Sequence, residues 1–202
     1  GRLGDRQVFS SAQVERLETP RTTLAARNGL SYGYGLGNYA WLRSGVTFQG
    51  HGGDADGYLS RLGYTRHNDT GYFLVITAFQ PATIRRMGAL VERHLLRGSE
   101  SPAAPPIHQP HGDVIQAMSG RYRRVTRRFP GAPVDDGTLL AVYSRGDSLY
   151  TRLGAAQPRP LLAVSDRLYR REGQTRATLF LGPGEDGQWY FQEEKDNFRK
   201  VQ

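Results

Sequence analysis

The sequence contains no cysteine among its 202 residues, and this absence excludes several kinds of chemistry. Without cysteine the chain cannot form a disulfide framework, a cysteine-rich zinc site or a thiol nucleophile. Long apolar runs are also missing, because stretches such as 72–79 fall far short of the roughly 20 residues that a membrane-spanning helix needs. No signal-peptide pattern opens the chain. From the sequence we expect no membrane span, no cofactor and no metal.

Lysine is scarce, since Lys195 and Lys200 are the two lysines and the other basic residues are arginines. The net charge of +8 is spread evenly over the two halves of the chain, whereas nucleic-acid-binding surfaces concentrate their positive charge. The one cluster comprises Arg121, Arg123, Arg124, Arg127 and Arg128. We interpret it as the solvated face of a strand and expect no nucleic-acid partner, with anion or nucleic-acid binding as the weaker alternative.

A proline-rich stretch divides the chain. Pro102, Pro105, Pro106 and Pro110 lie so close together that this stretch cannot be a helix or a central strand. We therefore predict a first domain over residues 1–98, a linker over 99–112 and a second domain over 113–202. The second domain holds seven or eight short strand patterns separated by turn residues, which predict a small antiparallel β barrel or sandwich.

The first domain combines helical and strand patterns. Ser10 and Gln13 form a capping-box pattern that predicts a helix ending near Glu18. A second helix is predicted over 82–97 from its apolar stripe. Antiparallel strands are predicted over 34–41, 46–49, 57–66 and 72–79.

Three motif-like patterns lack the context that their chemistry requires. The stretch 29–33 matches a G-x-S-x-G nucleophile elbow, but no strand precedes its serine and no helix follows it. Residues 35–40 match a loose dinucleotide fingerprint without the surrounding βαβ unit. His108 and His111 lie in the proline-rich stretch without carboxylate neighbours. We discard all three.

Four glycines surround His51: Gly50, Gly52, Gly53 and Gly57. Glycine weakens a strand unless another backbone or a ligand must approach closely. The cluster thus predicts a strand edge that is kept bare so that a substrate can lie against it. The alternative is a glycine-rich antiparallel sheet that contains a buried structural histidine.

An ordered set of features resembles the C-terminal part of the serine β-lactamase and penicillin-binding-protein-like hydrolases, in the class C, esterase and D-peptidase branch. The set comprises Y-G-L-G at 34–37, H-x-G at 51–53, Gly57-Tyr58, an apolar strand over 73–79 and the helix over 82–97. Residues after the linker resemble the small β domain appended to many of these enzymes, and 119–122 looks like its opening strand. The resemblance implies an α+β fold, with an antiparallel-sheet fragment of a β-lactamase/transpeptidase-like domain, a closing helix and a small all-β barrel-like domain.

The resemblance also implies a site. The backbone N–H of Asp54 would donate to the oxyanion. His51 takes the place of the lysine of the family's triplet, where it would face the substrate carboxylate or the Ser/Tyr proton network. The implied substrate-binding residues are Gly52, Gly53, Gly57 and Tyr58.

The chain departs from this family because its Ser-x-x-Lys and Tyr-x-Asn motifs are absent. We therefore expect the C-terminal part of a serine hydrolase that acts through an acyl-enzyme on a peptide, amide or ester. A peptidase or esterase is favoured over a potent β-lactamase. The chain would be inactive alone, because its partner would be the missing N-terminal part of the same hydrolase domain. From the resemblance we also expect a periplasmic or extracellular location. The alternative is a non-catalytic binding or accessory module.

Overall fold

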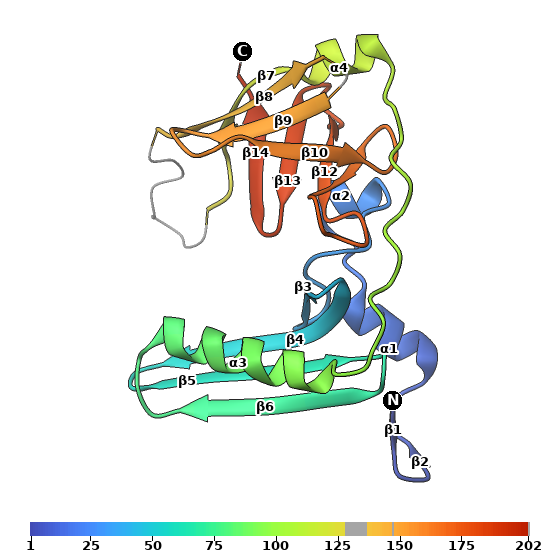
Figure 1. Cartoon of the computed structure of the whole chain (residues 1–202), viewed down its shortest axis with the longest axis vertical. Helices are drawn as coiled ribbons and strands as arrows, with labels where there is room; N and C mark the ends of the chain where they lie inside the picture. Colours follow the sequence, from blue (N-terminus) through green and yellow to red (C-terminus); the bar gives the residue numbers. More distant parts are fainter. Residues whose placement is uncertain (128–136, 147, 202) are drawn as a thin grey trace. The chain divides into compact units, whose positions relative to one another are not determined.

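The computed structural model describes residues 1–127, 137–146 and 148–201, so Arg128 of the arginine cluster lies outside the described residues. The chain forms two compact units (Figure 1). The first unit contains residues 1–20 and 32–103, and the second contains 21–31 and 104–202. Strands outnumber helices, so the predicted α+β class is confirmed with β structure predominant. Within the described residues, no helix is both long and apolar enough to cross a bilayer.

The first unit is built on an antiparallel sheet of four strands in the order β3-β4-β5-β6. Its strands are β3 (Tyr39–Arg43), β4 (Val46–Ala55), β5 (Tyr58–Thr65) and β6 (Thr70–Ile76). Two-residue turns join β3 to β4 and β4 to β5, and Gly45 and Gly57 adopt the positive φ that such turns require. A small hairpin of β1 (Arg2–Leu3) and β2 (Arg6–Gln7) precedes the sheet in the chain.

Two helices belong to this unit. The first, α1 (Ser11–Glu18), begins at the predicted capping box, in which Ser10 and Gln13 bond each other's backbone N–H groups. The second, α3 (Pro81–Leu95), starts with proline in its first turn and lies across the sheet (Figure 1). Its C-terminal end packs on Phe48, which is fully buried.

A buried carboxylate ties α3 to the sheet. Glu92 is inaccessible to solvent, and its oxygens accept hydrogen bonds from four side chains. These donors are Trp41 Nε1 at 3.0 Å, Arg43 Nε at 2.7 Å, Arg61 Nη2 at 3.2 Å and the Tyr72 hydroxyl. The helix position is therefore fixed by polar contacts as well as by apolar packing.

The second unit is a closed antiparallel barrel in the order β10-β11-β12-β13-β14-β7-β8-β9. Its strands are β7 (Gly120–Arg124), β8 (Leu139–Arg145), β9 (Ser148–Leu153), β10 (Arg159–Ala163), β11 (Leu168–Arg170), β12 (Leu179–Pro183), β13 (Trp189–Glu193) and β14 (Asp196–Lys200). Alternate residues point inward, and Tyr122, Tyr169, Leu179 and Phe191 are completely buried. The predicted barrel is confirmed, and the sandwich alternative is wrong because the first and last strands of the set pair with each other.

Two short helices accompany the barrel. The helix α4 (Gly112–Met118) places Met118 in the barrel core, and the helix α2 (Leu24–Arg27) contacts β12. The sequence did not predict α4, which lacks a side-chain cap.

Two strand boundaries differ from the prediction by five residues or more. The strand predicted over 34–41 begins at Tyr39, because residues 35–38 form a tight turn in which Gly35 N–H donates to the Asn38 carbonyl at 2.7 Å. Gly37 takes a φ of 62° in that turn. The strand predicted over 46–49 continues instead to Ala55, so His51 lies inside a strand.

We expect the fold to lose stability at alkaline pH because of four tyrosines with raised pKa values. Burial, followed by the hydrogen bond to Glu18, raises the pKa of Tyr64 to about 12, and burial also raises the pKa values of Tyr72, Tyr122 and Tyr169. Because the folded-state pKa exceeds the unfolded value, these groups stabilise the fold fully below about pH 10. The free energy of unfolding should then fall as the pH rises from about 10 to 12. Urea denaturation at several pH values measures the free energy of unfolding. In Tyr64→Phe this free energy should fall less steeply between about pH 10 and 12. A fall as steep as in the parent would show that Tyr64 does not contribute.

Candidate functional site

The strand β4 is paired along only part of one edge. The pairing of β4 with β3 stops at Gly50, which pairs with Tyr39, the first residue of β3. The pairing of β4 with β5 continues to Ala55. On the β3 side, residues 51–55 therefore have no partner strand among the described residues. We call this stretch the free edge of β4.

The register shows which backbone groups the free edge presents. Ala55 and Tyr58 flank a two-residue turn, so they form a hydrogen-bonded pair, and every second residue of β4 faces β5 in the same way. The residues between them face the opposite side. The N–H and C=O groups of Gly52 and Asp54 thus point away from β5, toward the free edge.

The glycines around His51 have different physical causes. A side chain at Gly50 would place its Cβ 2.0 Å from the Leu62 carbonyl oxygen, and one at Gly53 would lie 2.7 Å from Ser60 Oγ. Gly57 is required by its φ of 79° in the turn. Only at Gly52 does an added Cβ meet ordinary contacts, the nearest being the Tyr39 hydroxyl at 3.4 Å. The close neighbours on β5 therefore account for Gly50 and Gly53 without a substrate.

His51 is exposed and lies within a group of aromatic rings. The Tyr34 hydroxyl is 2.6 Å from His51 Nε2. The His51 ring lies edge-on to Tyr34 at 5.8 Å and to Tyr39 at 5.5 Å between centroids, and the two tyrosine rings stack at 5.9 Å. The structure thus excludes the alternative of a buried structural histidine, because His51 is open to solvent.

A loop held by backbone hydrogen bonds positions Tyr34. Ala40 N–H donates to the Gly33 carbonyl at 3.0 Å, and Tyr34 forms a single β-bridge with Tyr39. The loop also rests against the end of α1, because Leu36 N–H donates to the Leu17 carbonyl at 2.9 Å. The sequence did not identify Tyr34 as a partner of His51; the separation of 17 positions and the tight turn between them concealed the contact.

The structure brings all the predicted site residues into the β4–β5 hairpin. His51, Gly52, Gly53 and Asp54 all lie in the free-edge stretch; the backbone groups of Gly52 and Asp54 point outward, while those of His51 and Gly53 face β5. Gly57 lies in the turn, and Tyr58, the first residue of β5, is exposed. Among the described residues, no serine is hydrogen-bonded to His51, so the hairpin lacks an activated nucleophile.

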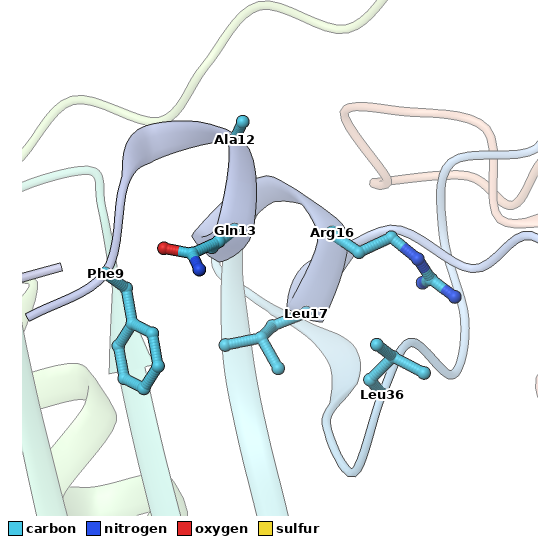
Figure 2. A pocket seen from close by; sticks show the side chains of 6 residues that line it. All are labelled: Phe9, Ala12, Gln13, Arg16, Leu17 and Leu36. Carbon is cyan, nitrogen blue, oxygen red and sulfur yellow. The ribbon is translucent and has the colours of Figure 1, made fainter.

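A separate hollow of about 390 Å³ lies beside α1 (Figure 2). It is lined by Phe9, Ala12, Gln13, Arg16, Leu17 and Leu36. The Gln13 carboxamide is engaged in the helix cap, so few polar groups remain for chemistry. Over the described ranges, no cluster of three or more histidine and acidic side chains could hold a metal.

Comparisons with known proteins give distant structural neighbours. No family model matches the chain, and no curated protein matches it. A crystal structure of SurE aligns with a TM-score of 0.46 at 16% identity over 98% of this chain and 45% of its own. SurE with D-Leu aligns with a TM-score of 0.44 at 19% identity over 84% of this chain and 40% of its own. The octameric penicillin-binding protein homologue from Pyrococcus abyssi aligns with a TM-score of 0.34 at 20% identity over 98% and 43%. The chain thus spans less than half the length of the SurE chains.

The interpretation of the chain as the C-terminal portion of a serine β-lactamase or penicillin-binding-protein-like hydrolase is wrong. Eight of the strands close into a barrel around their own core, so the described fold is not a β-lactamase fragment. The resemblance was the basis for an exported location, which stays a prediction.

Proposed function

We propose that the free edge of β4 binds an extended peptide or acyl-amide segment as an added strand. In this proposal the edge also serves acyl-transfer chemistry on the bound ligand. The nucleophilic serine is supplied by a second polypeptide. The observation that carries the proposal is the register, because it turns the backbone groups of Gly52 and Asp54 outward beside His51. Extended ligands bind exposed sheet edges through such main-chain groups.

The free edge offers two elements of acyl-transfer catalysis. When a serine hydroxyl attacks a carbonyl carbon, the carbonyl oxygen becomes an oxyanion that needs backbone N–H donors. The N–H of Asp54 supplies one such donor. The imidazole of His51 stands three residues before it, where it can hydrogen-bond the ligand or exchange a proton with the reacting groups.

An apolar sheet face supports the participation of a second polypeptide. Leu62, Phe73 and Val75 share the face opposite α3, and each is between 46% and 66% exposed. The adjoining outer edge of β6 carries no charge and has no strand partner in the described part of the chain. Contiguous apolar surface of this kind marks interaction sites. A polypeptide that adds a strand to β6 covers both features, whereas a face-to-face second copy leaves the β6 edge open.

The competing function is a binding module without catalysis, since an open strand edge suffices for peptide recognition. The two functions share the ligand and differ in whether an acyl group is transferred. An assay of ester hydrolysis in the presence of a serine-bearing partner distinguishes the two functions, because only the catalytic one predicts turnover.

The chain alone should not react with a serine-directed probe. An unperturbed serine hydroxyl is a poor nucleophile, and no serine among the described residues is hydrogen-bonded to His51. Mass spectrometry after incubation with a fluorophosphonate should therefore show the unmodified mass. Stoichiometric labelling of Ser31, or of any other serine, would overturn the requirement for a second segment.

Strand addition predicts a specific effect of proline at position 54. Asp54→Pro removes the outward N–H without breaking the β4–β5 ladder, whereas Asp54→Ala retains the N–H and serves as the matched control. We expect Asp54→Pro to weaken binding of an acetyl-capped Val-Thr hexapeptide amide about fivefold, as the loss of one hydrogen bond implies. Isothermal calorimetry or NMR titration measures the affinity. Equal affinities of the two variants would contradict an added strand at this edge.

A further inference from the structure

The hydroxyl of Tyr34 and the ring of His51 form a pair whose hydrogen-bond direction determines what the free edge offers to a ligand. The Oη–Nε2 distance of 2.6 Å leaves no room for an intervening water. One group must donate and the other accept. With respect to the described residues, His51 Nδ1 has no hydrogen-bond partner, so it remains open to a ligand.

The chemistry of the two groups favours donation by tyrosine. A phenol is a much stronger acid than the N–H of a neutral imidazole, and the unprotonated imidazole nitrogen is the more basic acceptor. The Tyr34 O–H therefore donates to Nε2. Because the hydrogen bond at one ring nitrogen sets the protonation of the other, the proton of neutral His51 resides on Nδ1.

We infer that Tyr34 is a positioning residue that holds His51 in the Nδ1–H tautomer. His51 then presents a hydrogen-bond donor close to the β4 backbone, since Nδ1 is the ring nitrogen nearer the main chain. This inference rests on the proposed function and specifies its ligand: the edge takes a segment with a hydrogen-bond acceptor, a carbonyl or carboxylate oxygen, beside His51. His51 serves as a donor to that oxygen, and its Nε2 is not available as a general base.

The packing around the pair keeps this orientation. The His51 ring is held edge-on by Tyr34 and Tyr39, and the loop that carries Tyr34 is hydrogen-bonded to α1. Removing the Tyr34 hydroxyl alone should leave these ring contacts in place. The tautomer can therefore be tested separately from the packing.

The test is a long-range ¹H–¹⁵N spectrum of the uniformly ¹⁵N-labelled chain at pH 8. We expect the wild-type His51 ring, assigned by its loss in His51→Asn, to be protonated mainly at Nδ1. Tyr34→Phe should shift the majority to the Nε2–H tautomer, which histidine otherwise favours in water. Tyr39→Phe is the control that removes a neighbouring hydroxyl without touching the pair, and it should leave the spectrum of His51 unchanged.

An Nε2–H tautomer in the wild-type chain, or an unchanged tautomer in Tyr34→Phe, would overturn the inference. A purely structural role of Tyr34 would alter stability without switching the tautomer. Failure of the proposed function has a different signature: the tautomer would respond as expected, while the acetyl-capped hexapeptide would show no binding to the wild-type chain.

Discussion

Replacing Glu92 with glutamine should destabilise the first unit by about 3 kcal/mol, because it leaves two partly buried arginine charges without their counter-charge. Glu92 is wholly inaccessible, and its two closest cationic partners are Arg43 at 2.7 Å and Arg61 at 3.2 Å. Arg61 also lies over the Trp41 ring at 4.4 Å, so the change disturbs a packed network. Such a loss is a large fraction of the stability of a small domain.

Trp41 fluorescence in a Trp189→Phe background measures the effect, because this background isolates the tryptophan of the first unit. Glu100→Gln is the matched control, since Glu100 is an exposed carboxylate of the same unit. Urea midpoints should coincide for the control and the parent. A Glu92→Gln midpoint within experimental error of the parent would show that the network does not hold α3 on the sheet.

In the barrel, truncating Glu193 should cost more than truncating its partner Arg171. The Arg171 guanidinium donates to both Glu193 oxygens, at 3.1 and 2.7 Å, and to Thr151 Oγ1 at 2.8 Å. The Arg171 side chain is 6% exposed and that of Glu193 is 28% exposed. Glu193→Ala leaves the more buried charge, that of Arg171, without a partner and should cost about 3 kcal/mol. Arg171→Met leaves the more solvated charge of Glu193 without a partner and should cost about 1 kcal/mol.

Trp189 fluorescence in a Trp41→Phe background reports barrel unfolding, and Glu194→Gln at the exposed neighbouring position is the control. The order of the two costs is the informative result. If Arg171→Met were the more destabilising variant, the hydrogen bonds from Arg171 to β9 and β10 would outweigh the charge pair.

The elements that depend on local sequence were predictable. The Ser10–Gln13 capping box and the proline at the start of α3 act within one helical turn, so the pattern alone specifies them. Closure of the barrel was not fixed by local pattern, because pairing of β10 with β9 and of β14 with β7 depends on the whole strand set. The turn at 35–38 was mistaken for strand because Gly37 supplies a positive φ that alternation does not reveal.

The candidate site was only partly predictable for a similar reason. The glycine cluster directed attention to His51, but several of those glycines serve close packing against β5 or the turn geometry. The free edge depends on where β3 begins, which is set by the turn before Tyr39. The Tyr34–His51 contact joins a loop residue to a residue of β4 and left no local signal.

Amide hydrogen exchange at Gly52 and Asp54 is the decisive test of an open β4 edge that accepts an added strand. Both N–H groups face the free edge, so they should exchange rapidly in the free chain, while the Gly53 amide, which faces β5, should be protected. Saturation with the acetyl-capped Val-Thr hexapeptide should slow exchange at Gly52 and Asp54 and leave Gly53 unchanged. An analogue N-methylated at every peptide nitrogen has no N–H to donate along either edge, so it cannot pair as a strand and should give no protection. Slow exchange at both positions in the free chain, or no change on addition of the peptide, would contradict the account.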